Sequence, residues 1–169
     1  MTGAPYAPRR HDLRPDVALV PVDPVIADAL AARIVALDPW ASLGLSAAAM
    51  AERITRPWAA THRFVVEVDG AAAGYVSVRW PFMRGPYLET IAVFPEAQRR
   101  GLARAVIEWM GREAPPGEVD LWLCVSDWNA PARAAYRALG FVEIGPIADL
   151  VAPGRTEIFM RRRLAPPIG

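Results

Sequence analysis

The spacing of apolar residues changes along the chain, and each change predicts a different kind of element. Runs rich in β-branched and aromatic residues predict strands, because those side chains pack well on a pleated surface. Apolar residues that recur every three or four positions predict helices that bury one face. The expected strands lie at 17–20, 64–68, 74–78, 88–94, 121–125, 141–144 and 156–160, and the expected helices at 24–37, 47–56, 102–113 and 132–139.

Capping and turn residues mark the boundaries of these elements. Asp23-Pro24 places an N-cap residue before a proline in the first turn, and Ser46 can cap the second helix. Asp69-Gly70 between two strand-like runs is typical of a hairpin, and Gly140 can end the last helix. The order β-α-α-β-β-β-α-β-α-β-β predicts the α/β class, with a single mixed sheet of about seven strands flanked by about four helices.

The composition fits one globular domain. The chain has 169 residues, 53% of them hydrophobic, which is enough for a single core. We expect this domain to span residues 16–164, after a flexible, proline-dotted arm over residues 1–15. A formal net charge of +1 gives no reason to expect nucleic acid as a partner, and no apolar run reaches the length of a membrane span. We expect a monomer or a homodimer.

The few cysteines and histidines exclude several kinds of site. Cys124 is the only cysteine, so no intramolecular disulfide can form and the reducing cytoplasm is the expected location. His11 and His62 lie far apart in sequence, and without a C-x-x-C motif no metal site is expected. A cysteine inside an apolar run such as 121–125 is usually an inert core residue rather than a nucleophile.

Residues 91–104 carry the most informative pattern, a buried strand that turns into the start of a helix. The first N–H groups of a helix lack partners and lie at the positive end of its dipole, so they form an anion site that suits a pyrophosphate. Gly101 and Ala103 leave the backbone accessible there. Charge-assisted donors are available from Arg99, Arg100 and Arg104. The sequence contains neither a P-loop nor a dinucleotide-binding motif, which disfavours those two enzyme classes.

Two linked motifs then indicate a family. Gln98-x-x-Gly101-x-Ala103, after Ile91-Ala92-Val93, resembles the acetyl-CoA signature of the GNAT superfamily of N-acetyltransferases. Leu121 to Val125, Asn129, Tyr136 and Leu139-Gly140-Phe141 resemble that superfamily's next strand, helix and closing Gly-Phe. The resemblance implies the acyl-CoA N-acyltransferase fold and acetyl-CoA as co-substrate. It also implies direct transfer of an acetyl group to a small-molecule or peptide amine in a ternary complex.

The resemblance also assigns residues to the binding of acetyl-CoA. The strand at 88–94 would diverge from the strand at 121–125, and the pantetheine arm would pair with free main chain between them. The residues so implied are Ile91, Ala92, Val93, Gln98, Arg99, Arg100, Gly101, Leu102, Ala103, Arg104, Asn129, Ala132 and Tyr136. Asn129 also stands where an ordinary helix N-cap would, so both of its roles stay open.

The chemistry needs two proton carriers. An ammonium must lose a proton before it attacks a thioester, and the departing thiolate needs a proton. Tyr136 matches the tyrosine that serves such families as the proton donor, although its helical face also suits a core aromatic. Glu89 is the candidate general base.

Strand alternation would place Glu89 on one face with Tyr87, Ile91 and Val93, where a carboxylate is costly unless it is used or paired. The alternative is an ion pair with Arg79 or Arg84.

One difference limits what the resemblance implies about the acceptor. Bacterial enzymes that acetylate the N-termini of ribosomal proteins resemble this chain around residues 121–140, but they carry a catalytic glutamate where Cys124 stands. Their substrate therefore does not transfer to this chain. The acceptor is expected to contact segments 39–43, 80–85 and 147–150. Two rival functions remain: a non-catalytic sensor of acyl-CoA, and a nucleic-acid-binding protein that uses the arginines.

Overall fold

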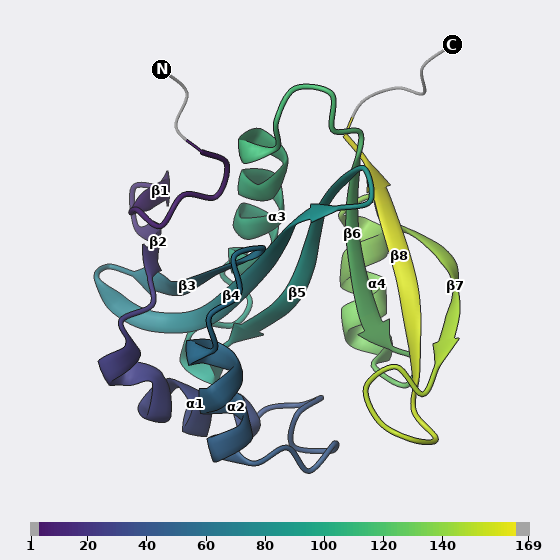
Figure 1. Ribbon diagram of the computed structural model, residues 1–169, viewed down its shortest axis with the longest axis horizontal. Helices are drawn as coiled ribbons and strands as arrows, with labels where there is room; N and C mark the ends of the chain where they lie inside the picture. Colours follow the sequence, from purple (N-terminus) through teal and green to yellow (C-terminus); the bar gives the residue numbers. More distant parts are fainter. Residues whose placement is uncertain (1–3, 165–169) are drawn as a thin grey trace.

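The computed structural model describes residues 4–164, and within that range eight strands form one mixed sheet in the order β1-β2-β3-β4-β5-β6-β8-β7 (Figure 1). The strands are β1 His11–Arg14, β2 Val17–Pro21, β3 Thr61–Val68, β4 Ala71–Phe82, β5 Gly85–Val93, β6 Asp120–Ser126, β7 Val142–Ala148 and β8 Thr156–Arg163. The helices are α1 Ala27–Val35, α2 Ala47–Thr55, α3 Leu102–Glu113 and α4 Ala130–Ala138, with short 3₁₀ turns η1 Pro24–Ile26 and η2 Pro95–Ala97. The expected fold class, one mixed sheet with flanking helices, is confirmed, with one strand more than expected.

Local signals mark where three helices begin, two of them through a side-chain cap and one through a glycine. Ser46 caps α2, since its Oγ accepts a hydrogen bond from the backbone N–H of Ala49 at 3.1 Å. Asn129 caps α4, since its Oδ1 accepts from the N–H of Ala132 at 3.2 Å. Gly101 precedes α3 with a φ of 72°, a left-handed conformation that glycine adopts without a steric penalty.

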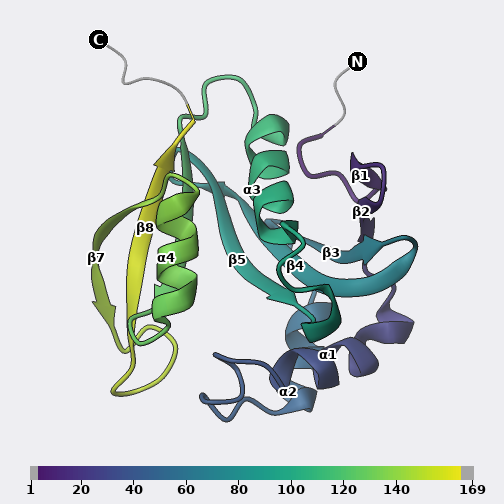
Figure 2. The same ribbon diagram turned by 180° about the vertical axis from the view of Figure 1, so that it is seen from behind.

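Side chains of alternate strand residues point to opposite faces of the sheet, and each face carries its own apolar core. Helices α1 and α2 pack over Val65 and Tyr75 on one face. On the other face α3 packs over the neighbouring residues Phe64 and Val76, and α4 joins the same core through Tyr136. Figure 2 shows α3 and α4 side by side on that face. The central strands are therefore covered by α1 and α2 on one face and by α3 and α4 on the other.

The segment expected to be a flexible arm is instead part of the fold over residues 4–14. Tyr6 is completely buried, and its hydroxyl donates a hydrogen bond to the carbonyl of Met110 on α3 at 2.7 Å. His11 begins β1, and both its ring and that of Tyr6 pack edge-on against Trp109, with centroids 5.1 and 5.4 Å away. The expectation was wrong because these anchors contact residues about a hundred positions away, which apolar spacing within the segment does not reveal.

Candidate active site

Strands β5 and β6 are parallel neighbours that separate soon after they meet. They pair only through Tyr87 with Trp122 and Leu88 with Leu123. Beyond these pairs, residues 89–93 of β5 and 124–126 of β6 run apart, and we call the space between them the β5–β6 opening. It lies in the middle of the sheet, between the strands that carry the two motifs (Figure 1).

The backbone of β5 leaves polar groups free on the side of the opening. Phe94 donates its N–H to the carbonyl of Ala73, next to β4, at 2.9 Å. Because successive residues of a strand point their main-chain groups to opposite sides, those of Ile91 and Val93 point toward the opening. The carbonyl of Val93 accepts a hydrogen bond from the side-chain amide of Gln98 at 3.2 Å. The remaining groups can pair with an extended ligand.

A β-bulge in β5 changes which side chains share a face. Ser77 pairs with Thr90, but Val78 pairs with Leu88, so Glu89 is an extra residue in the ladder. The bulge reverses the alternation, and Ile91 therefore packs in the same core as Leu88. The expectation that Tyr87 and Glu89 share a face with Ile91 and Val93 was thus wrong, because strict alternation does not survive an inserted residue.

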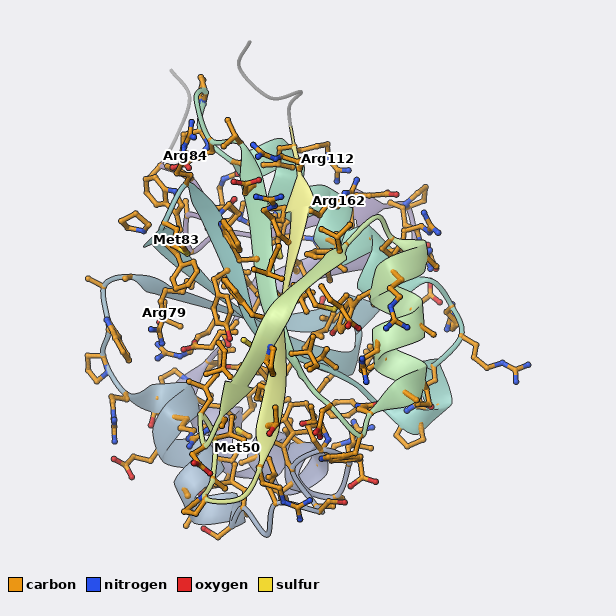
Figure 3. All side chains as sticks on the ribbon, turned by 90° about the vertical axis from the view of Figure 1, so that its right-hand side faces the viewer. Met50, Arg79, Met83, Arg84, Arg112 and Arg162 are labelled. Carbon is orange, nitrogen blue, oxygen red and sulfur yellow. The ribbon has the colours of Figure 1, made fainter. Side chains whose placement is uncertain are left out.

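Glu89 has an ion-pair partner. Its Oε1 accepts from Nη2 of Arg79, which stands opposite Tyr87 on β4. The guanidinium of Arg79 also lies over the ring of Trp58, 4.3 Å from its centroid. In Figure 3, Met83 and Arg84 of the β4–β5 hairpin lie on one side of Arg79, and Met50 of α2 lies on the other. Of the two alternatives for Glu89, the structure thus contains the ion pair, with Arg79 rather than Arg84.

A cavity of about 340 Å³ lies at the N-terminus of α3. Its lining residues are Val93, Ala97, Gln98, Arg99, Gly101, Leu102, Ala103, Arg104, Ala135, Ala138 and Leu139. Arg99 and Gly101 both have a positive φ, 61° and 72°, so the turn before α3 is a concave run of backbone that can bind an anion. A Cβ at Gly101 would come within 4 Å only of Arg14 Nη1, at 3.7 Å, so the backbone conformation rather than crowding requires glycine here.

Only two of the three expected arginines line this cavity. Arg99 and Arg104 do so, whereas the Arg100 guanidinium lies 3.4 Å from Asp16 Oδ2 and 3.9 Å from Asp69 Oδ2. These acids stand in the turns after β1 and β3, far from Arg100 in sequence. Arg14, which the sequence did not indicate, donates a hydrogen bond to the carbonyl of Arg100 at 2.9 Å. This contact holds the backbone of the turn before α3.

Helix α4 forms the opposite wall of the cavity. Ala135, Ala138 and Leu139 line it, and the sequence reasoning missed them although they recur at helical spacing. Tyr136 lies on the same helix, half-buried, with its ring edge-on to Phe141 at a centroid distance of 5.9 Å. Burial raises the pKa of Tyr136 to about 12, so its hydroxyl keeps its proton at neutral pH.

Several expected binding residues lie outside the cavity. Ala92 is buried on the face of α1 and α2, Ala132 packs against the core beneath α4, and the side-chain oxygen of Asn129 is used as a helix cap. Ile91 lies deeper, along the β5–β6 opening. None of these four residues is among those that line the cavity.

The face opposite α3 and α4 carries further polar groups beside the β5–β6 opening. Burial raises the pKa of the Cys124 thiol and, more strongly, that of the Tyr87 hydroxyl. A thiol kept protonated is a poor nucleophile, in keeping with the inert role expected for Cys124. Glu157 of β8, which the sequence did not single out, is buried and accepts a hydrogen bond from Ser126 Oγ at 2.6 Å.

Of the three expected acceptor segments, 39–43 contacts the β7–β8 loop, which begins within segment 147–150, and the β4–β5 hairpin makes a different contact. Nη2 of Arg155, in the β7–β8 loop, donates to the carbonyl of Ser42, in the α1–α2 loop, at 3.4 Å. The β4–β5 hairpin instead contacts the start of β6, where Val119 donates to the carbonyl of Arg84 at 3.0 Å. The hairpin therefore lies at the closed end of the β5–β6 pair.

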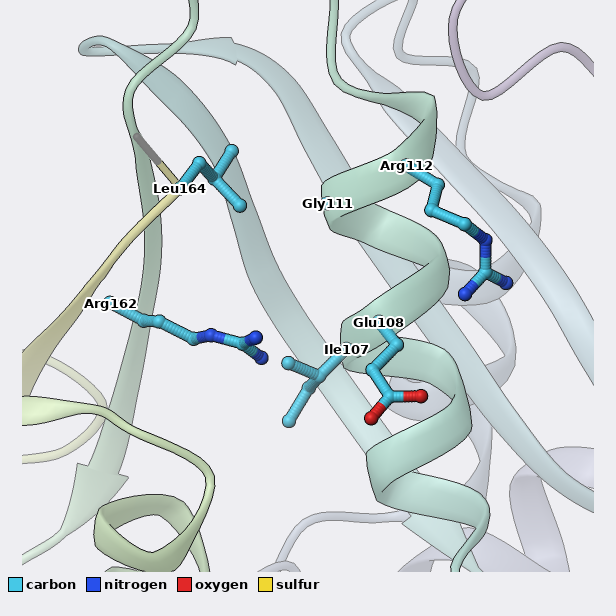
Figure 4. Close-up of a pocket in the computed structure, with 6 residues that line it drawn as sticks. All are labelled: Ile107, Glu108, Gly111, Arg112, Arg162 and Leu164. Carbon is cyan, nitrogen blue, oxygen red and sulfur yellow. The ribbon is translucent and has the colours of Figure 1, made fainter. Parts of the chain in front are cut away.

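A second cavity, of about 300 Å³, lies at the other end of α3. Its lining residues are Ile107, Glu108, Gly111, Arg112, Arg162 and Leu164. Figure 4 shows Arg162 of β8 and Leu164, which follows β8, pointing toward α3, while the guanidinium of Arg112 points to the other side of the helix. This cavity is separate from the β5–β6 opening and from the turn at Gly101.

The described residues contain no group of three or more His, Cys, Asp or Glu side chains arranged to hold a metal ion. Among the helices of residues 4–164, none is long and apolar enough to cross a membrane.

Comparison with known proteins agrees with the geometry. Peptidyl-lysine N-acetyltransferase YiaC of Escherichia coli K12 is 36% identical over 78 residues, which are 46% of this chain and 48% of that protein. A ribosomal protein bS18 alanine N-acetyltransferase of Salmonella typhimurium is 49% identical over 57 residues, 33% of this chain and 38% of that protein. The chain thus matches about half or less of the length of these curated relatives.

Solved structures share the fold over nearly the whole chain. The ribosomal-protein-S18-alanine N-acetyltransferase of Escherichia coli superposes with a TM-score of 0.64 at 22% identity, covering 90% of this chain and 96% of that one. RimL, a ribosomal L7/L12 acetyltransferase in complex with coenzyme A, superposes with a TM-score of 0.68 at 13% identity, covering 92% and 98%. The family profile described as the acetyltransferase (GNAT) family matches residues 35–141. This chain belongs to the GNAT acetyltransferase family.

Proposed function

We propose that this chain is an N-acetyltransferase that takes an acetyl group from acetyl-CoA and transfers it directly to an amine. The observation that carries the proposal is the continuity of two features: the cavity at the N-terminus of α3 and the β5–β6 opening. Val93 belongs to both, since it lines the cavity and ends the free edge of β5. A ligand with an anionic end and an extended amide-containing arm fits this arrangement.

The residues present fit coenzyme A. The backbone of the turn at Arg99 and Gly101 would bind the pyrophosphate, with the Arg99 and Arg104 side chains as cationic donors. The main chain of Ile91 and Val93 would bind the pantetheine amides. Helix α4 would close the other side through its small residues. Bound acetyl-CoA would supply the acetyl group as a thioester.

We assign the proton donor to Tyr136. Its hydroxyl keeps its proton across the range in which enzymes work, and none of the described residues accepts a hydrogen bond from it. A donor near the sulfur lowers the energy of the departing thiolate. Glu89 is one candidate for the proton acceptor, although the Arg79 ion pair gives it a partner of its own.

The acceptor is an amine of a small molecule or of a peptide. One curated relative is described as a peptidyl-lysine N-acetyltransferase and another as a ribosomal protein bS18 alanine N-acetyltransferase, which supports an amine acceptor without choosing its class. The cytoplasm is the proposed location, supported by the single free Cys124.

Release of free thiol from acetyl-CoA in the presence of an amine panel tests the proposal. The panel should contain small amines, peptides with free N-termini and peptides with lysine. Amine-dependent thiol release supports the transferase. Saturable binding of acetyl-CoA with no turnover on any amine would instead favour the sensor, and salt-sensitive binding to duplex DNA would favour the nucleic-acid binder.

A further inference from the structure

Glu157 differs from the carboxylates of this arginine-rich chain that form ion pairs. Glu89 pairs with Arg79, and Glu143 lies between two arginines of α4. Glu157 is only 6% exposed, and within residues 4–164 no arginine lies within 4.0 Å of its carboxylate. The Ser126 hydroxyl is its hydrogen-bond donor. A buried carboxylate without a cation is costly, and such groups concentrate where proteins use them.

The strand register places Glu157 beside the β5–β6 opening. Ser126, which pairs with Glu157 across β6 and β8, stands three residues beyond Leu123, the last residue of β6 to pair with β5. Ile158 and Met160 pack in the core beneath α3 and α4. By alternation Glu157 therefore lies on the opposite face.

That face also carries the groups on which the charge of Glu157 acts. Its negative charge contributes to the raised pKa values of Cys124 on β6 and Tyr87 on β5, so the carboxylate lies close enough to influence both sides of the β5–β6 opening. Tyr136 belongs to the other face. The arrangement separates a proton donor on one side of the sheet from a carboxylate on the other.

The surroundings also make this carboxylate more basic. Burial raises the pKa of Glu157, and the nearby charge of Asp127 raises it further, whereas the hydrogen bond from Ser126 opposes the rise. The other ionisable groups that face Glu157 are Cys124 and Tyr87, and neither carries a positive charge. A carboxylate with a raised pKa accepts a proton from an ammonium more readily than an ordinary one.

We propose that Glu157 is the general base of the acetyl transfer, accepting the proton of the incoming ammonium directly or through one water. This inference rests on the proposed acetyltransferase function. It also accounts for the absence of a carboxylate at position 124 of β6, where Cys124 stands. Glu157 of the neighbouring strand β8 would supply the carboxylate on this side of the β5–β6 opening.

The proton transfers balance. Glu157 takes one proton from the ammonium and passes it to solvent, which leaves a neutral amine. The nitrogen lone pair forms the C–N bond, the C–S bond breaks with its electron pair on sulfur, and sulfur takes the proton of Tyr136. The second proton that nitrogen loses as the amide forms returns to Tyr136 through water. One proton is released overall.

The test is the pH dependence of kcat/KM for the best amine of the panel, with wild-type protein and Glu157→Gln. Glutamine keeps the shape and can still pair with Ser126, but it cannot accept the proton. We expect a loss of about 10²-fold or more near pH 7 that shrinks above the pKa of the amine itself, with an unchanged KM for acetyl-CoA. Glu143→Gln, which removes an exposed carboxylate on β7, is the matched control and should keep the wild-type rate.

A second variant tests the same assignment without removing the carboxylate. Ser126→Ala deletes the hydrogen bond that holds the pKa of Glu157 down, so the acid limb of the pH profile should move to higher pH. This measurement decides the matter if Glu157→Gln does not fold. An unmoved acid limb in Ser126→Ala would overturn the assignment.

The outcomes separate this inference from the function on which it rests. A wild-type chain that acetylates no amine overturns both. An active wild type with an equally active Glu157→Gln variant overturns only the role of Glu157. If Glu89→Gln shows the pH-dependent loss in its place, the base is Glu89 despite its pairing with Arg79.

Discussion

Side chains around the β5–β6 opening divide into those already engaged by the protein and those free to meet a ligand. The Asn129 oxygen caps α4, the Gln98 amide binds the carbonyl of Val93, and the Arg100 guanidinium lies beside acids of two turns. Arg99 and Tyr136 have no such engagement among the described residues. The binding and reaction of a ligand at this site should therefore depend most on the side chains of Arg99 and Tyr136.

Tyr136→Phe tests the proposed proton donor, because it removes the hydroxyl and keeps the ring against Phe141. We expect kcat to fall about 10²-fold or more with little change in the affinity for acetyl-CoA. Since the pKa of Tyr136 is about 12, the loss should stay constant across pH 6 to about 10.

Tyr6→Phe is the matched control, since it removes a buried hydroxyl remote from the β5–β6 opening. It should keep the wild-type kcat. A variant Tyr136→Phe with full turnover and a lowered melting temperature would return Tyr136 to a packing role.

Gly101→Val tests the turn that begins α3. With φ at 72°, a β-branched residue is strained by roughly 1–3 kcal/mol, so the turn should deform and the KM for acetyl-CoA should rise tenfold or more. Arg112→Gln is the comparison, because Arg112 lies about 15 Å along the same helix and lines the other cavity. Equal effects of the two changes would show that the phosphate site lies elsewhere.

At the scale of the elements, β1 and the segment before it hold the start of the chain to α3. The hydrogen bond from Tyr6 to the carbonyl of Met110 is the buried polar contact of this attachment. Arg14 at the end of β1 then supports the turn at the other end of the same helix. The N-terminal segment thus contacts both ends of the helix on which the proposed pyrophosphate site depends.

Tyr6→Phe measures the strength of the attachment. Loss of one buried hydrogen bond should lower the free energy of unfolding by about 1 kcal/mol, seen as a lower midpoint in urea. The activity of the folded protein should stay at the wild-type level. An unchanged midpoint would mean that the aromatic packing against Trp109 holds the segment without the hydrogen bond.

For the whole molecule, Glu157 makes a specific contribution to the pH dependence of stability. Its pKa is raised by folding above the ordinary value of 4.5, so between these two values the folded state binds more protons than the unfolded state. The free energy of unfolding should therefore fall as the pH rises through this window. Urea denaturation at a series of pH values should show a steeper decline above pH 4.5 for wild type than for Glu157→Gln. Parallel curves would contradict a raised pKa at this position.

Elements that depend on nearby residues were predictable. The expected bounds of the helix at 102–113 match α3, because its apolar spacing and the preceding Gly101 are local signals. The cap role of Asn129 was one of two expected readings for the same reason. The bulge at Glu89 was not predictable, since it depends on how β4 and β5 pair.

The amino-acid sequence by itself determined the order of elements from β2 onward, the mixed sheet and the turn at Gly101 that begins the phosphate-facing helix. These follow from capping, glycine conformation and apolar period, which act over a few residues. Only the tertiary structure decided that Arg100 pairs with Asp16 and that Glu157 stands beside the β5–β6 opening. Both are contacts between segments distant in sequence, and their energies depend on burial and charge that exist only after the sheet has assembled.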